Sequence, residues 1–186
     1  MPTSKQIILG IDPGYADMGW GVISIENRTL NYILCDTIKT TKNRPMPERL
    51  RELDLTIQKL FKKYKPDLLS VEKIFFAANQ KTAIEVAQAR GIVLLAAAHH
   101  GVPVVEYTPL QVKQALTSSG NADKSQVAHM VKVMLKLKEM PTQDDAIDAI
   151  AIALCAAFDN SVIARIRPGR RATPARLRGL AGSNLH

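Results

Sequence analysis

The sequence predicts an α/β protein with a five-stranded mixed sheet flanked by helices. The first third of the chain contains three strand-like segments in succession, and the remainder alternates short apolar runs with longer segments of helical periodicity. Consecutive strands favour an antiparallel meander, whereas strands separated by helices favour parallel pairing with right-handed crossovers. With 186 residues and no internal repeat, the chain is long enough for one such domain with a substantial core.

The three N-terminal strands are predicted from β-branched and apolar runs that turn residues separate. A Pro-Gly turn precedes the second run, and Asn27-Arg28 separates the second from the third. The expected strands are Gln6–Asp12, Gly19–Glu26 and Leu30–Thr40.

The first helix is expected to begin at Pro45 and Pro47, since proline is tolerated in a first helical turn. It should end near Lys62–Lys65, because basic side chains stabilise a helix C-terminus and Pro66 cannot continue the helix. The later elements are expected as a strand at Asp67–Glu72, a helix capped by Asn79 and ending near His100, a strand at Val102–Glu106, a helix at Pro109–Leu116, a loop at Thr117–Asp123, and helices at Lys124–Leu137 and Thr142–Phe158.

The net charge of +8 is concentrated at the C-terminus. All seventeen acidic residues lie at or before Asp159, where nineteen basic residues leave a surplus of +2, and six arginines follow. We therefore expect a folded domain at 1–158 and a basic, disordered tail at 159–186. The tail has two interpretations of similar weight, loose contact with nucleic-acid phosphates or simple solubilisation.

Composition indicates an ordinary globular protein of the cytoplasm. The chain has 46% hydrophobic and 23% charged residues, and it contains no run of eighteen apolar residues that would predict a membrane span. Its polar N-terminus lacks a signal-peptide core. Cys35 and Cys155 lie in apolar surroundings, which is typical of reduced packing residues.

Four acidic residues are candidates for a metal site. Asp12 and Glu72 end apolar strands, and Asp145 and Asp148 lie three residues apart at the start of an apolar helix. Acids are rarely placed in such surroundings without a counter-charge, and converging carboxylates repel one another unless a cation lies between them. Oxygen ligands of this kind suit hard divalent ions, so the pattern predicts metal-assisted attack on a phosphodiester.

Each acid also has a structural interpretation. Asp12-Pro13-Gly14 is ordinary turn chemistry, Glu72 could form a salt bridge, and Thr142-x-x-Asp145 resembles a capping box. Asp144 competes with Asp145, because residues three and four apart share a helix face almost equally well. Singly, each acid is better explained by structure; together, four such placements favour a site.

Several ordered motifs then resemble the RuvC Holliday-junction resolvases. The resemblance runs from about Ile7 to Ala157 and covers nearly the whole predicted domain. The motifs are Ile8-Leu9-Gly10-Ile11-Asp12-Pro13-Gly14 with Gly19 and Gly21, Val71-Glu72-Lys73-Ile74-Phe75, Gln88-Ala89-Arg90-Gly91, Gln111-Val112-Lys113-Gln114, Asp123-Lys124-Ser125-Gln126-Val127 and Asp145-Ala146-Ile147-Asp148-Ala149.

The resemblance implies an RNase H-like fold, a homodimer and magnesium-dependent, symmetric nicking of four-way DNA junctions, with a branch-migration complex as a partner. It implies that the family's catalytic and metal-binding acids correspond to Asp12, Glu72, Asp145 and Asp148, with two magnesium ions per site and manganese as a substitute. It further implies junction-binding roles for Lys113, Lys124 and Phe75. The simpler interpretations are solvated surface lysines and a core aromatic.

Three other functions are compatible with parts of the sequence. A nuclease of the same fold could cut RNA–DNA hybrids or precursor RNA, because carboxylates bound to metal read phosphates and not strand topology. A nucleotide-binding protein of the actin and sugar-kinase type also begins with a strand and an Asp-x-Gly turn, but it needs a second similar domain and a glycine-rich phosphate loop. A junction-binding protein without catalysis is disfavoured by the four intact acids.

Overall fold

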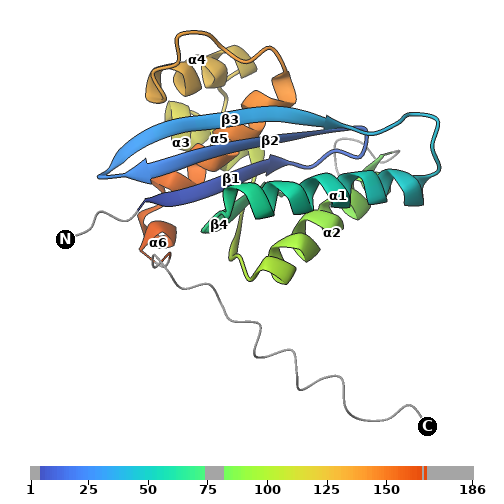
Figure 1. Ribbon diagram of the computed structural model, residues 1–186. Coiled ribbons are helices and arrows are strands. Elements are labelled where there is room, and N and C mark those ends of the chain that lie inside the picture. Colours follow the sequence, from blue (N-terminus) through green and yellow to red (C-terminus); the bar gives the residue numbers. More distant parts are fainter. Residues whose placement is uncertain (1–4, 74–81, 165, 167–186) are drawn as a thin grey trace.

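A computed structural model describes residues 5–73, 82–164 and 166, and it contains the five-stranded mixed sheet that the sequence predicts (Figure 1). The strand order is β3-β2-β1-β4-β5. β1 pairs antiparallel with β2, β2 antiparallel with β3, and β4 parallel with both β1 and β5. The strands are β1 (Gln6–Asp12), β2 (Asp17–Glu26), β3 (Thr29–Lys39), β4 (Leu68–Glu72) and β5 (Val104–Tyr107).

Helices cover both faces of the sheet (Figure 1). Helices α1 and α2 lie on one face, and α5 lies on the other, with α3 and α4 packed against it. The helices are α1 (Met46–Tyr64), α2 (Ala83–His100), α3 (Pro109–Thr117), α4 (Lys124–Met134), α5 (Asp144–Phe158) and α6 (Asn160–Ile163).

The two-residue alternation of the central strands divides the core into two clusters. In β1, Leu9 and Ile11 are buried against α1 and α2, whereas Ile8 belongs to the cluster around α5. In β4, Leu69 likewise faces α1 and α2, and Leu68 faces α5. The same alternation directs Gly10 and Asp12 in β1, and Ser70 and Glu72 in β4, toward α5.

A row of small residues lets α5 approach the sheet closely. Gly10 pairs with Gly21 in β2 and with Ser70 in β4. A Cβ atom on Gly10 would lie 2.1 Å from the carbonyl oxygen of Ala149, and one on Gly21 would lie 2.5 Å from Cδ1 of Ile150. The fully buried Ser70 hydroxyl donates a 2.8 Å hydrogen bond to the carbonyl oxygen of Ile152. The row therefore fixes the height of α5 above the three central strands.

Gly19 extends this contact to the start of α5. A Cβ atom on Gly19 would lie 1.9 Å from the carbonyl oxygen of Asp145. Gly19 also pairs with Asp12 across β1 and β2. The close approach therefore brings the first turn of α5 over the end of β1.

The start of α5 differs from one prediction. The capping box expected at Thr142 and Asp145 is wrong: Gln143 is the N-cap residue, and its side chain makes no capping hydrogen bond. Asp144 and Asp145 are instead the first two helical residues, where negative charge interacts favourably with the helix dipole.

Two capping boxes occur where none was predicted. Thr108 and Gln111 form one at the start of α3, and Asp123 and Gln126 form another at the start of α4. Helix α4 ends at Met134, three residues earlier than predicted, and Lys136 follows in the left-handed region with φ of 52°. The described part of α2 begins at Ala83, and the predicted cap Asn79 lies outside the described residues.

The packed structure continues past the domain end expected at residue 158. Asp159 caps the short helix α6 by accepting hydrogen bonds from the amides of Ser161 and Val162. Val162 and Ile166 are buried in the α5 cluster. The side-chain amide of Gln6 also donates a 2.9 Å hydrogen bond to the carbonyl oxygen of Ile166. Residues 159–164 and 166 are therefore attached to the sheet.

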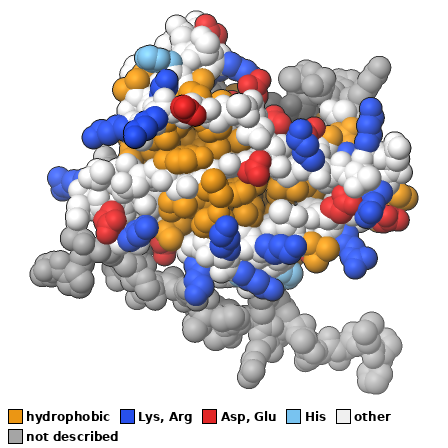
Figure 2. Space-filling model, turned by 45° about the horizontal axis from the view of Figure 1, so that its top comes forward, with side chains coloured by type: hydrophobic (Ala, Val, Ile, Leu, Met, Phe, Trp, Pro, Cys, Tyr) orange, Lys and Arg blue, Asp and Glu red, His pale blue; other side chains and the backbone are white. Residues whose placement is uncertain are grey.

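The edge near β3 and α4 is only partly covered. Leu30 and Tyr32 of β3 and Met130 and Met134 of α4 are partly buried against the α5 cluster. Figure 2 shows apolar side chains gathered in the centre of this face, with lysine and arginine side chains around them.

Among the residues that the structure describes, no helix has the length and apolar character needed to cross a membrane.

The small-residue row makes a testable contribution to stability. Gly10→Ala should lower the free energy of unfolding by about 1–3 kcal/mol or more, because the new methyl group meets the backbone of Ala149. Gly120→Ala is the matched control: its methyl group meets mainly the end of the exposed Leu110 side chain, and the expected change is under about 0.5 kcal/mol. Urea denaturation measures both values. Equal stability of the two variants would contradict a packing limit at Gly10.

Candidate active site

Two predicted acids meet at the ends of adjacent parallel strands. β1 and β4 run in the same direction with Ile11 beside Val71, so Asp12 and Glu72 are the next residues on neighbouring strands. Both side chains are half-buried and point to the α5 side of the sheet. The charge of Glu72 raises the pKa of Asp12, which shows that the two carboxyl groups act on each other. The sheet therefore places two carboxyl groups at neighbouring strand ends.

Helix α5 adds the other two predicted acids. Asp145 and Asp148 lie in its first two turns and are half-buried, whereas Asp144 is exposed. The charges of Asp145 and Asp148 both act on Asp12, so the structure brings all four predicted acids into one cluster. Gly19 beneath Asp145 makes this convergence sterically feasible.

The cluster is electrostatically strained. Burial, followed by the charges of Glu72, Asp148 and Asp145, raises the pKa of Asp12 from its ordinary 3.8 to about 8. Burial and the charge of Asp148 also raise the pKa of Glu72, although its hydrogen bond with Asp12 acts in the opposite direction. At neutral pH, Asp12 therefore retains a proton unless a nearby cation compensates its charge.

Asp17 is an acidic neighbour of the site that the sequence interpretation missed. The pKa of Asp145 is raised first by burial and then by the charge of Asp17, ahead of that of Asp148. Asp17 begins β2, and its carboxylate lies 4.0 Å from Nζ of Lys39. The available signal was the strand alternation, because Asp17 lies two residues before Gly19 on the face of the sheet that α5 covers.

Two lysines line the opposite side of the acid cluster. Nζ of Lys124, the first residue of α4, lies 3.1 Å from Oδ2 of Asp148, and this contact raises the pKa of Lys124. Lys113 of α3 and Lys124 border a cavity of about 120 Å³, together with Glu72 and Asp148. The Lys124 side chain is 75% exposed, so it remains accessible to an incoming anion. Phe75, the predicted junction-binding aromatic, lies outside the described residues.

The donor chemistry of the cluster fits a hard divalent cation. All four acids supply carboxylate oxygens, and the raised pKa values of Asp12, Glu72 and Asp145 reflect crowded negative charge that a cation would offset. Across the described ranges, no three Asp, Glu, His or Cys side chains already stand in a metal-binding arrangement.

The strand order, with α5 packed across the central strands, is that of an RNase H-like fold. A sequence profile for the family described as crossover junction endodeoxyribonuclease RuvC matches residues 8–156. The chain belongs to this RuvC family, and the match covers the sheet except the first two residues of β1, together with every residue of the acid cluster.

Individual relatives agree with this assignment over most of their length. The crossover junction endodeoxyribonuclease RuvC of Rubrobacter xylanophilus is 50% identical over 167 residues, which cover 90% of this chain and 93% of that protein. The structure of Thermus thermophilus RuvC aligns with a TM-score of 0.77 and 38% identity, covering 82% and 94% of the two chains. The same protein in complex with a Holliday junction substrate aligns with a TM-score of 0.74 and 36% identity, covering 82% and 93%.

The raised pKa of Asp12 predicts a pH-dependent loss of stability without metal. The folded state binds the Asp12 proton more tightly than the unfolded state between pH 3.8 and about 8, so the free energy of unfolding should fall as pH rises through this range. Asp12→Asn removes this contribution because asparagine does not ionise. Urea denaturation in EDTA at pH 5 and pH 8 should therefore show a larger decrease for the wild type. Parallel decreases in the two proteins would show that the pKa of Asp12 is not raised.

Proposed function

We propose that this protein is a magnesium-dependent endonuclease that resolves four-way DNA junctions by paired symmetric nicks, in homologous recombination and DNA repair. Membership of the RuvC family supports the reaction and the substrate. The observation that carries the assignment of the site is the convergence of four carboxyl groups around Asp12. We expect the protein to act in the cytoplasm.

Asp12, Glu72, Asp145 and Asp148 would hold the ions, two in each site. Magnesium held there would supply an activated water and stabilisation of the leaving oxygen in phosphodiester hydrolysis. The carboxylates orient the ions from three separate elements, the ends of β1 and β4 and the start of α5. The strong mutual repulsion of these acids favours their joint binding to cations.

The two lysines would neutralise the phosphate that enters the site. Lys124 pairs with Asp148 at the edge of the cluster, and Lys113 lines the same cavity. When cations occupy the carboxylates, the Lys124 ammonium group becomes available for a phosphate oxygen or for charge that develops during cleavage. We also propose that Phe75 stacks on a base at the junction, as the family resemblance implies.

A homodimer would place two such sites on one junction. One side of α2 supports this proposal, because Ile84 and Leu95 are 68% and 51% exposed. Gly91 lies between them on this side, and a Cβ atom there would meet no atom within 4 Å. An apolar face with a small residue in its centre allows close packing on a symmetry-related copy. Two-fold symmetry would then relate the nicks, and a branch-migration complex is the expected further partner.

Substrate preference tests the proposed function directly. A panel of a four-way junction, duplex DNA, an RNA–DNA hybrid and single strands should show cleavage of the junction, dependent on magnesium and abolished by EDTA. The cuts should map to symmetric positions on strands of like polarity. Preferential cleavage of the hybrid would instead support the alternative RNase H-type nuclease.

Asp148→Asn should separate binding from catalysis. We expect a decrease in the cleavage rate on the order of 100-fold or more, with junction affinity retained, because the variant loses a metal ligand but keeps the lysines. The exposed neighbour Asp144 provides the matched control: Asp144→Asn should cleave within a few-fold of the wild type. Single-turnover kinetics and gel-shift binding measure the two effects. Full cleavage by Asp148→Asn would exclude Asp148 from the site.

The dimer proposal has a test of its own. Leu95→Asp should shift sedimentation equilibrium toward monomer and reduce paired nicking, because it places a charge on the proposed interface. Leu55→Asp changes an equally exposed leucine on α1, 50% exposed against 51% for Leu95, and should remain dimeric. If both variants stay dimeric, α2 is not the interface.

A further inference from the structure

The loop between β1 and β2 is held by contacts with Thr40, just after β3, and with Arg49 of α1, the helix on the face of the sheet opposite α5. This loop, residues 13–16, begins directly after Asp12, and β2 then starts at Asp17. The hydroxyl of Thr40, just after β3, donates a 2.7 Å hydrogen bond to the carbonyl oxygen of Tyr15. The amide of Thr40 also donates to the carbonyl oxygen of Ala16 at 2.9 Å.

Arg49 of α1 joins this contact through three interactions. Its Nε donates to Oγ1 of Thr40 at 2.8 Å, and one terminal nitrogen lies 3.4 Å from the carbonyl oxygen of Tyr15. Its guanidinium carbon lies 4.6 Å from the centre of the Tyr15 ring, within the range of a cation–π interaction. Arg49 therefore contacts the backbone and the ring of the same loop residue.

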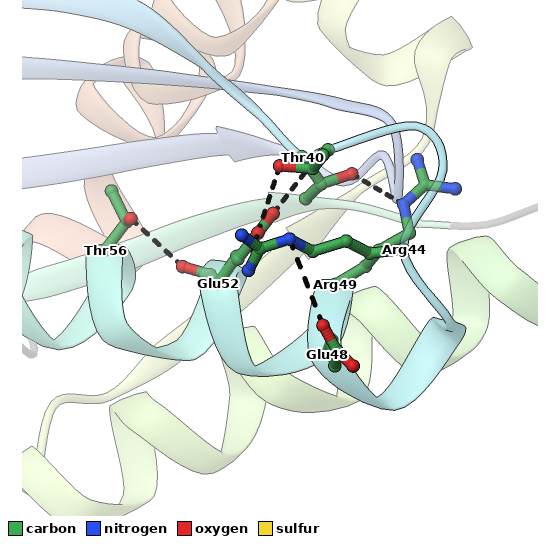
Figure 3. Close-up of polar contacts among 7 residues, drawn as sticks. Thr40, Arg44, Glu48, Arg49, Glu52 and Thr56 are labelled. Carbon is green, nitrogen blue, oxygen red and sulfur yellow. Dashed lines mark hydrogen bonds and ion pairs between the residues drawn. The ribbon is translucent and has the colours of Figure 1, made fainter.

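A second set of contacts keeps α1 in register with the end of β3 (Figure 3). The carboxylate of Glu52 accepts hydrogen bonds from the amide and the hydroxyl of Thr41 at 2.9 and 3.1 Å. Arg44 lies 2.9 Å from the same carboxylate. Because Glu52 lies one turn after Arg49, these contacts fix the part of α1 from which Arg49 extends.

The loop contacts affect the acid cluster because the loop is tightly packed between Asp12 and the start of β2. Gly14 packs so closely on the start of β2 that a Cβ atom there would lie 1.8 Å from the carbonyl oxygen of Asp17. Asp12 ends the strand on one side of this turn, and Asp17 begins the next strand on the other side. A shift of Tyr15 would therefore be transmitted to Asp12, on whose carboxyl group the charges of Glu72, Asp145 and Asp148 act.

We propose that Arg49 is a positioning residue for the nuclease reaction, which holds the turn after Asp12 so that the Asp12 carboxylate keeps its place among the metal ligands. The inference rests on the proposed function of the acid cluster. Arg49 itself reaches the site only through Tyr15 and Thr40. A displacement of about 1 Å at a reacting group can reduce a rate on the order of 100-fold, so a remote anchor can affect the rate strongly.

A competing role for Arg49 is contact with the phosphates of DNA. That role would lower junction affinity and leave metal binding unchanged, whereas positioning affects metal binding first. The two roles therefore differ in a measurement that needs no cleavage. Arg51, an exposed arginine on the same helix, controls for the loss of one positive charge.

The experiment compares Arg49→Ala, Arg49→Lys, Thr40→Val, the double variant with both Arg49→Ala and Thr40→Val, and Arg51→Ala with the wild type. Binding of Mn²⁺ without DNA is followed by electron paramagnetic resonance of the free ion, and junction affinity is measured in EDTA. Single-turnover cleavage is then measured across magnesium concentrations. Thermal denaturation identifies any variant that does not fold, and Arg49→Lys keeps the charge if Arg49→Ala does not fold.

We expect Arg49→Ala to weaken Mn²⁺ binding about 10-fold, to raise the magnesium concentration at half-maximal rate similarly, and to leave junction affinity within about 2-fold. Arg49→Lys should recover part of the loss, since lysine keeps one donor but not the planar fork. Thr40→Val should resemble Arg49→Ala, and the double variant should be no worse than either. Arg51→Ala should bind Mn²⁺ like the wild type.

Other outcomes would overturn the inference. Unchanged Mn²⁺ binding by folded Arg49→Ala would contradict a positioning role. If junction affinity also fell, Arg49 would be a phosphate contact. If only thermal stability fell, Arg49 would have a purely structural role. Additive losses in the Thr40→Val double variant would show that the two residues act separately. If the wild type binds Mn²⁺ but does not cut junctions, the proposed function fails, while weaker Mn²⁺ binding by Arg49→Ala would still support a positioning role.

Discussion

The contact between the backbone of α5 and the small residues of β1, β2 and β4 is the constraint on which the site depends. Gly10 and Gly21 leave no side chain between helix and sheet, and Ser70 joins them with a buried hydrogen bond to Ile152. Only at this short separation can acids from a helix and from strand ends share one cluster. Larger side chains in the row would move Asp145 and Asp148 away from Asp12, even if the topology were unchanged.

The same closeness opposes stability. Burying Asp12 close to Glu72 costs more free energy than burying the two acids apart. The pKa of Asp12, raised to about 8 by burial and by neighbouring negative charge, reflects this cost. The fold maintains it through rigid packing, with β1 and β4 buried on both faces and α5 anchored along its length. Lys124 offsets part of the negative charge from the edge of the cluster. Strain concentrated at a few residues in an otherwise consistent fold is typical of functional sites.

Sequence reasoning succeeded where a local pattern carries the information. The strands, their mixed pairing and most helix boundaries follow from periodicity and turn residues, and the four acids stand out because charge is unusual at such positions. It failed where tertiary contact decides. Asp17 lies near Asp145 because of the alignment of β2 in the sheet. The capping box expected at Thr142 does not form, and the helix instead begins where its backbone packs against Gly19. The role proposed for Arg49 depends on Tyr15, which lies 34 residues away in sequence, and on Thr40, which lies nine residues away.

The order in which the acids occur along the chain has a consequence during synthesis. Asp12 and Glu72 leave the ribosome early, whereas Asp145 and Asp148 belong to the last long helix. Their convergence requires α5 to pack against β1 and β4. A nascent or truncated chain that ends before this helix therefore lacks half of the carboxylates, and cannot assemble the cluster. Under the proposed assignment of the acids as metal ligands, cleavage would therefore require a nearly complete domain.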